Sequence, residues 1–406
     1  MKRMKLVSTS GLALCAALAA AQAWTCFGGN PQRTGRTTAV IPNSPVQKWS
    51  FDLKGPMISS PVVAQDGTIY TGSVWWEGFV PNTYVTAINP DGTLKWRYES
   101  GWLEDQSLST PAIGPGGEIY FGTADGYFYA LSSAGQLLWR YPASSNVNSQ
   151  PVVAPNGTIY VYLGEQLTAF NPNGTVQWQH PLGRNVPGGP TLGTDGTIYA
   201  VASTGVIALW PNGTLRWTSA VGGSVAPPVV SQFGDVLVAG TYLNSLDAAT
   251  GNLRWTASPT FGMGNYGMPG VDAQGNVFYT AYVYIWKFDR FGATVWERQF
   301  LQGNRLGQSY SSIAVDGAGK IVHGMGSGKR WAIDIEKRLV IRDTNGNEVA
   351  TFNLPECTSN SSPAIGPDGT AYIGCLDGRL YAFGASFGDG PGGGRGRGGK
   401  GTGKGR

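Results

Sequence analysis

The sequence SSPVVAQDGTIY, at residues 59–70, recurs in seven further variants along the chain. Every copy places an apolar run before a glycine turn and starts a second apolar run after it. The turn glycines are Gly67, Gly117, Gly157, Gly196, Gly234, Gly275, Gly319 and Gly369. They follow one another at intervals of 38 to 50 residues, and a recurring interval of this size is typical of repeat architectures.

A second phrase follows most copies and ends in tryptophan, as in DGTLKW at residues 91–96. Six such tryptophans stand four residues after a glycine, whereas the seventh copy has Ala350 at that position. In the first unit, residues 61–64, 69–70, 85–88 and 94–98 are expected to form four strands, because Gly67 and Gly92 permit tight hairpin turns. Four-stranded units repeated about every 40 residues predict the blades of a β-propeller.

The two ends of the repeat region predict how the ring closes. The last copy has only three strands, through residues 379–383, and residues 46–51 supply a fourth with Trp49 at the tryptophan position. A strand that completes the last blade in this way removes two exposed sheet edges. We therefore predict an all-β fold, an eight-bladed propeller with four-stranded blades over residues 24–387. Its blade-packing tryptophans are Trp49, Trp96, Trp139, Trp178, Trp217, Trp255 and Trp296.

The ends of the chain differ from the repeats and carry its positive charge. Residues 1–23 have basic residues, an apolar run and small residues near Ala23, the pattern of a cleaved signal peptide rather than a membrane span. Residues 388–406 form a Gly-, Arg- and Lys-rich tail that we expect to be disordered. Without these ends, 21 Lys and Arg face 24 Asp and Glu, a net charge of about −3. We therefore expect a secreted monomer, periplasmic in a Gram-negative host, with no nucleic-acid partner.

The repeat phrases resemble those of the pyrrolo-quinoline quinone (PQQ) repeat family of eight-bladed propellers. Residues 245–255 nearly match the family's tryptophan-docking pattern, and residues 87–96 carry a version one residue shorter. Residues 24–35 resemble the segment that precedes the family's first strand. The family includes dehydrogenases that use PQQ with calcium and a non-enzymatic branch with the outer-membrane barrel-assembly lipoprotein. The resemblance implies the fold and leaves activity open.

Several observations argue against catalysis. Many of the family's dehydrogenases stack the quinone on a disulfide between adjacent cysteines, and no two cysteines are adjacent here. No cofactor or calcium ligand matches residue by residue, so we expect no bound cofactor and no metal. The two histidines exclude a three-His zinc site. His180 is expected just after the fourth strand of blade three and His323 on the second strand of blade seven, on opposite sides of the ring.

The cysteines suggest a disulfide rather than redox catalysis. Export permits disulfides, and Cys357 and Cys375 flank the first two strands of the last blade. We predict that these two pair, although Cys26 could compete for either. The expected role of the bridge is to hold the seam where the ring closes.

Loop lengths divide the predicted ring into two faces. The turns at the repeat glycines keep a constant length, whereas the connections on the other face vary and are longest in blades one and seven. Blades seven, eight and one are neighbours in a closed ring, so a variable sector is expected for binding a protein or a glycan. Its candidate residues are Trp75, Trp76, Phe79, Trp102, Glu104, Asp105, Arg305, Lys329, Arg330 and Trp331. The alternative is that the sector only shields the seam. Glu104 and Asp105 could form an acid–base pair, but adjacent loop carboxylates are usually only solvated.

Four Asn-X-Ser/Thr sequences are candidate glycosylation sites: Asn156, Asn173, Asn212 and Asn360. The first three fall in Asn-Gly-Thr turns, which favour asparagine for backbone reasons.

Taken together, the sequence predicts an exported, non-enzymatic binding or scaffolding propeller. The alternative function is a PQQ-dependent or carbohydrate-active enzyme on the same propeller.

Overall fold

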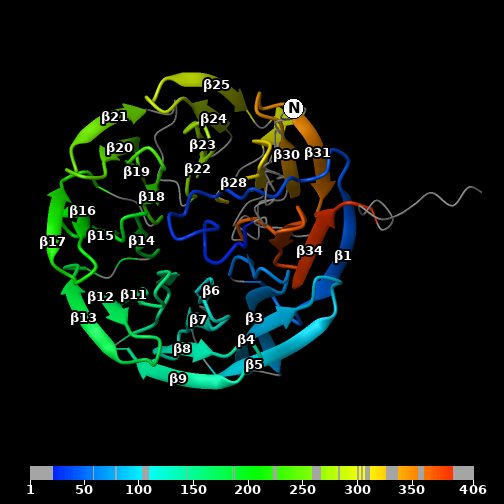
Figure 1. Cartoon of the computed structure of the whole chain (residues 1–406). Helices are drawn as coiled ribbons and strands as arrows, with labels where there is room; N and C mark the ends of the chain where they lie inside the picture. The colour runs from blue at the N-terminus through cyan, green and yellow to red at the C-terminus, as the bar shows by residue number, and fades with distance from the viewer. Residues whose placement is uncertain are drawn as a thin grey trace, which may run out of the picture.

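The computed structural model describes residues 22–57, 59–77, 80–102, 109–143, 145–184, 186, 188–222, 226–257, 267–281, 284–299, 301–302, 305–306, 311–325, 337–354 and 361–386. In these ranges the secondary structure consists of strands and turns without helices, and eight four-stranded antiparallel sheets form a ring (Figure 1). The predicted eight-bladed propeller is confirmed. No helix in this part of the chain has the length and apolar character needed to cross a membrane.

Blades one to seven each run from the inner strand outward in chain order. Blade one contains β2 (Val62–Val63), β3 (Ile69–Glu77), β4 (Val80–Ile88) and β5 (Leu94–Trp102). Blade two contains β6 (Ala112–Ile113), β7 (Ile119–Gly122), β8 (Tyr127–Leu131) and β9 (Leu137–Pro142). Blade three contains β10 (Val152–Val153), β11 (Ile159–Leu163), β12 (Gln166–Phe170) and β13 (Val176–Pro181). Blade four contains β14 (Thr191–Leu192), β15 (Ile198–Ala202), β16 (Gly205–Leu209) and β17 (Leu215–Ser219).

The second half of the ring repeats this order. Blade five contains β18 (Val229–Val230), β19 (Asp235–Ala239), β20 (Leu243–Asp247) and β21 (Leu253–Ala257). Blade six contains β22 (Gly270–Val271), β23 (Val277–Ala281), β24 (Tyr284–Phe288) and β25 (Thr294–Gln299), and the pair β26 (Leu301–Gln302) and β27 (Arg305–Leu306) follows it. Blade seven contains β28 (Ala314–Val315), β29 (Ile321–Met325), β30 (Arg338–Arg342) and β31 (Glu348–Asn353). Blade eight contains β32 (Ala364–Ile365), β33 (Ala371–Gly374), β34 (Arg379–Gly384) and, as its outer strand, β1 (Val46–Asp52).

The N-terminal strand closes the ring. β1 pairs antiparallel with β34 from Val46↔Gly384 to Asp52↔Arg379, with one irregularity next to Trp49. The closing blade is therefore built from both ends of the repeat region. In Figure 1 the blue β1 lies directly outside the red β34.

The turns divide the ring into two faces. A side-chain carbon placed on Gly67, in the β2–β3 turn, would lie 2.9 Å from the Pro90 ring in the β4–β5 turn. These two kinds of turn are therefore neighbours, and we call their side of the ring the short-turn face. The turns between second and third strands and the connections between blades lie on the opposite side, which we call the long-loop face.

Seven tryptophans in outer strands join each blade to the next. Each indole Nε1–H donates a hydrogen bond of 2.8–3.1 Å to a backbone carbonyl in the turn before the next blade's outer strand. The pairs are Trp49–Pro90, Trp96–Ser133, Trp139–Pro172, Trp178–Pro211, Trp217–Ala248, Trp255–Arg290 and Trp296–Thr344. The eighth position is Ala350, on β31. Blade eight has no turn between its two outer strands, because β34 and β1 come from opposite ends of the chain, so Ala350 has no turn on which an indole could dock.

The glycine in each of these turns is required by two separate constraints. Gly174 has φ +86°, a conformation that costs about 1–2 kcal/mol for a residue with a side chain. A side-chain carbon there would also lie 2.7 Å from the indole of Trp139, closer than two carbons can approach. The turn glycine thus provides both the backbone angle and the flat surface on which the indole packs.

We expect Gly174→Ala to lower the free energy of unfolding by roughly 2–3 kcal/mol, because strain and steric overlap add together. Gly234→Ala is the matched control, since Gly234 has φ +76° but no atom within 4 Å of the added carbon. It should cost only the strain, about 1 kcal/mol. Urea unfolding of both variants measures the difference. Equal costs would show that close packing against the indole is unimportant.

A serine before the inner strand extends five of the blades. Its Oγ accepts the N–H of a residue 13 positions later on the second strand, at 2.8–3.3 Å. The pairs are Ser59–Gly72, Ser109–Gly122, Ser149–Tyr162, Ser311–Gly324 and Ser361–Gly374. Each hydroxyl thus replaces a backbone hydrogen bond between the first and second strands, at a position where the two-residue inner strand has not yet begun.

Candidate functional site

Among the described residues, blade one has the longest strand pair on the long-loop face. β3 and β4 each have nine residues, four more than the corresponding strands of blades three to six. The register pairs Trp75 with Asn82, and Asn82 in turn pairs with Trp102 on β5. Trp75 and Trp102 therefore lie in one row across three strands. The Trp75 side chain is 36% exposed, and its ring lies 6.2 Å from that of Tyr84.

The remaining candidate residues of this sector are only partly placed. The backbones of Trp76 and Trp102 continue β3 and β5, and Arg305 lies on β27. Phe79, Glu104, Asp105, Lys329, Arg330 and Trp331 lie outside the described residues. The described part therefore brings Trp75, Trp76 and Trp102 to one hairpin extension. The grouping of all ten residues in one sector stays a prediction.

The centre of the ring holds a segment whose position the sequence did not reveal. Residues 24–41, which we call the hub segment, lie inside the ring (Figure 1). In six blades the N–H of the second inner-strand residue donates to a hub carbonyl at 2.6–2.9 Å. The pairs are Val63–Trp24, Ile113–Thr25, Leu192–Pro31, Val230–Gln32, Val271–Thr34 and Val315–Gly35. The hub segment thereby satisfies inner sheet edges that would otherwise leave backbone donors unpaired.

Arg33 extends the hub contacts to blade three. Its side chain is fully buried, and its guanidinium donates only to backbone carbonyls, those of Phe27, Gln150 and Pro190 at 2.8–3.0 Å and of Pro151 at 3.5 Å. Burial lowers the pKa of Arg33. Among the ion pairs of the described residues, none involves Arg33. The guanidinium therefore leaves a positive charge inside the ring that no carboxylate in the described part of the chain neutralises.

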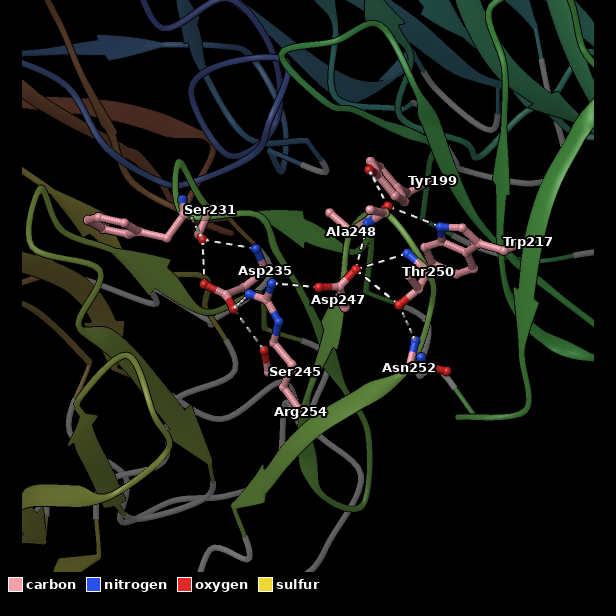
Figure 2. A network of polar contacts seen from close by, with 12 residues as sticks. Tyr199, Trp217, Ser231, Asp235, Ser245, Asp247, Ala248, Thr250, Asn252 and Arg254 are labelled. Carbon is pink, nitrogen blue, oxygen red and sulfur yellow. Dashed lines mark hydrogen bonds and ion pairs between the residues drawn. The ribbon is translucent and has the colours of Figure 1, made fainter.

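The short-turn face carries a charged cluster in blade five (Figure 2). Arg254 lies between Asp235 and Asp247, with Nη2 2.6 Å from Asp247 Oδ2 and Nη1 paired with Asp235 Oδ1. Burial would raise the pKa of Asp247, but hydrogen bonds from Arg254 and Thr250 hold it below its usual value. A cavity of about 290 Å³ lies beside the cluster. One guanidinium binds both carboxylates, so the cluster holds the turns of blade five together. For the same reason neither carboxylate of the cluster is free to act as a general acid or base.

Two exposed phenylalanines on the short-turn face were not predicted as site residues from the sequence. Phe233 and Phe291 stand directly before turn glycines and are 36% and 68% exposed. Arg290 lies between them, 4.7 Å and 4.8 Å from the two ring centres. The repeat alignment provided the signal, because most equivalent turn positions have aspartate, asparagine or a small residue.

Histidine and cysteine occupy structural positions. His180 lies within β13 rather than after it, because pairing with β12 continues to Pro181. His323 lies on β29, fully buried, and its Nε2 accepts a 3.2 Å hydrogen bond from Arg342. Cys375 is disulfide-bonded, and Cys26 is a free, buried thiol. Cys26 therefore does not form the disulfide of Cys375. Cys357 lies outside the described residues, so its pairing with Cys375 stays a prediction.

The asparagines of three glycosylation sequences cap their own turns. Asn156, Asn173 and Asn212 each accept the N–H of the threonine two residues later at 3.0–3.1 Å. This bond accounts for asparagine without any glycan. Asn360 lies outside the described residues, and glycosylation stays a prediction at all four positions.

The fold family raises the question of a quinone with calcium. In the described residues, no three His, Cys, Asp or Glu side chains gather closely enough to hold a metal ion. A calcium site built from three or more carboxylates is therefore not found in that part of the chain. We derive no chemical step through such a group.

The geometry places the chain among the eight-bladed propellers in which outer-strand tryptophans dock on the following blade. The family model described as outer membrane protein assembly factor BamB matches residues 11–165, 81–187 and 163–389. The chain belongs to this family, as the PQQ-repeat resemblance indicated. No curated protein matches the chain significantly.

Solved structures of two kinds share the fold. A europium-containing methanol dehydrogenase has a TM-score of 0.71 at 14% identity, covering 90% of this chain and 98% of that one. The quinohemoprotein alcohol dehydrogenase from Comamonas testosteroni has a TM-score of 0.69 at 14% identity, covering 90% and 81%. BamB from Moraxella catarrhalis has a TM-score of 0.63 at 18% identity, covering 84% and 98%. Identities this low establish a common architecture only.

Proposed function

We propose that the protein is an exported, non-enzymatic binding or scaffolding propeller that engages a protein or glycan through the long-loop face. The observation that carries this proposal is the extension of blade one, which holds the partly exposed Trp75 in one row with the backbone position of Trp102. Large aromatic side chains on a rigid support are typical of binding hot spots and of sugar-stacking surfaces. The family description, an assembly factor, supports a binding role.

The described polar clusters support the same function. The carboxylates of blade five are paired, and His323 is buried against Arg342. Neither arrangement offers a general acid or base at a cavity, as ordinary hydrolysis or proton transfer requires. The predicted export signal and the family's name favour a location outside the cytoplasm.

The test is partner capture by the immobilised protein from the host's extracellular or periplasmic fraction, together with a glycan array. The triple variant Trp75→Ala, Trp76→Ala, Trp102→Ala should reduce capture at least 100-fold, because each buried aromatic anchor contributes about 2 kcal/mol or more to binding. Its thermal unfolding should remain cooperative.

The control is the double variant Phe233→Ala, Phe291→Ala, which removes exposed rings from the short-turn face. It should capture the partner as the unchanged protein does. If the control lost capture while the triple variant retained it, the partner would bind the short-turn face, and the proposed long-loop surface would be wrong.

The competing function is a PQQ-dependent enzyme, which the likeness to the two dehydrogenases favours. Titration with PQQ and calcium, followed by absorption spectroscopy and native mass spectrometry, separates the two functions. Stoichiometric retention of the quinone would contradict the scaffold proposal.

A further inference from the structure

A polar cavity opens on the long-loop face, away from the extended hairpin of blade one. Its volume is about 520 Å³, within the size range of small-molecule sites, and it is lined by Ser145, Asn146, Asn148, Ser149, Tyr162, Gly164 and Val186. The lining comes from the connection between blades two and three, the end of β11 and the connection to blade four. It contains no carboxylate side chain.

Three residues of this lining carry a hydroxyl whose hydrogen has no acceptor among the described residues. Ser145 Oγ is buried and has no hydrogen-bond partner. Ser149 Oγ accepts the Tyr162 N–H at 3.0 Å, and the Tyr162 hydroxyl accepts the Val201 N–H at 3.3 Å. The Ser149 and Tyr162 oxygens act as acceptors in these bonds, so each hydroxyl still has a hydrogen to donate. A buried donor without an acceptor costs free energy, so a ligand that supplies acceptors would be stabilised here.

The surrounding charge favours an anion. Arg33 donates to the carbonyl of Gln150, the residue after Ser149, and its charge has no carboxylate partner among the described residues. Burial raises the pKa of Tyr162, while the charges of Arg33 and Arg184 act to lower it, so both guanidinium groups affect this site. Glu165, in the adjoining turn, is exposed.

We propose that this cavity binds a carboxylate, held by the hydroxyls of Ser145, Ser149 and Tyr162 in the positive field of Arg33 and Arg184. Hydrogen bonds from three donors to an ionised acceptor are the strong, charge-assisted kind. The carboxylate belongs either to a small free acid or to the end of a peptide chain. The site is separate from the extended hairpin, so it does not depend on the proposed partner surface.

Isothermal titration calorimetry with matched probes tests the proposal. Succinate represents a free acid and succinamide its uncharged counterpart, while trialanine with a free or an amidated C-terminus represents a chain end. We expect saturable binding of succinate or of free trialanine, with the matching amide bound at least tenfold more weakly. Succinate identifies a free-acid site, and binding of trialanine alone identifies a chain-end site.

Variants locate the binding in the cavity. Ser145→Ala removes a hydroxyl that has no bond in the protein, so folding should be unaffected and affinity should fall about tenfold. Tyr162→Phe should have a similar effect. Tyr279→Phe, which deletes another buried hydroxyl without a partner on blade six, should leave affinity unchanged. The proposal is overturned if no carboxylate binds, if the amides bind equally well, or if Ser145→Ala retains full affinity.

Discussion

Replacing Arg33 with methionine should lower the free energy of unfolding by about 3–5 kcal/mol. Methionine fills part of the same volume but donates no hydrogen bond, so the buried carbonyls of Phe27, Gln150 and Pro190 lose their donors. Each unsatisfied buried acceptor costs about 1–3 kcal/mol, partly offset because the charge no longer has to be desolvated. Urea unfolding followed by tryptophan fluorescence measures the change.

Arg36→Met provides the control within the hub segment. Arg36 is only half-buried, and its side chain donates to the side chain of Gln232 at 2.7 Å. Its loss should change stability by at most about 0.5 kcal/mol. If both arginine variants were equally stable, the contacts of Arg33 with blades three and four would not hold the ring together.

The architecture could be predicted because each blade repeats the same local chemistry. Glycine at a fixed place permits the turn, and tryptophan four residues after the second turn glycine packs against the neighbouring blade. Even the exception at Ala350 follows from the closure, since the next blade lacks the corresponding turn. Strand ends were less predictable. β3, β4 and β5 run further than expected because the inserted residues continue the pairing on the long-loop face.

The hub segment escaped prediction for a physical reason. Its residues follow no alternating or helical pattern, because their contacts with six of the blades are made by backbone carbonyls. Arg33 is 117 residues from Gln150 and 157 from Pro190 in the sequence, so no local signal connects them. Loop length predicted the insertion in blade one, and the structure places it in the extended β3–β4 hairpin, whereas the binding role of this surface stays a prediction. The carboxylate cavity combines short connections whose lengths are ordinary, and only the fold brings them together.

Acidification should destabilise the protein through His323. Burial lowers the pKa of His323 well below its usual value of 6.5, and the positive charges of Arg342 and Arg338 lower it further. The folded protein therefore keeps this imidazole neutral while the unfolded chain takes up a proton near pH 6.5. Between these two pKa values the unfolded state binds more protons, so the free energy of unfolding decreases as the pH falls below about 6.5. The expected slope is about 1.4 kcal/mol per pH unit in the interval between the two pKa values.

Urea unfolding at pH 8, 6.5 and 5 tests this dependence in the unchanged protein and in His323→Gln. The variant should be less stable at pH 8, because the Nε–H of Arg342 loses the buried imidazole as its acceptor, but it should lose less stability between pH 6.5 and 5. His180→Gln is the control, since His180 is half-buried on an outer strand, and it should keep the slope of the unchanged protein. Carboxyls with lowered pKa values, such as those of Asp195 and Asp368, affect stability only below about pH 4. Asp316, whose pKa is raised by burial, acts in the opposite direction and is common to all three proteins. Equal slopes for the unchanged protein and His323→Gln would therefore show that the buried histidine does not control acid stability.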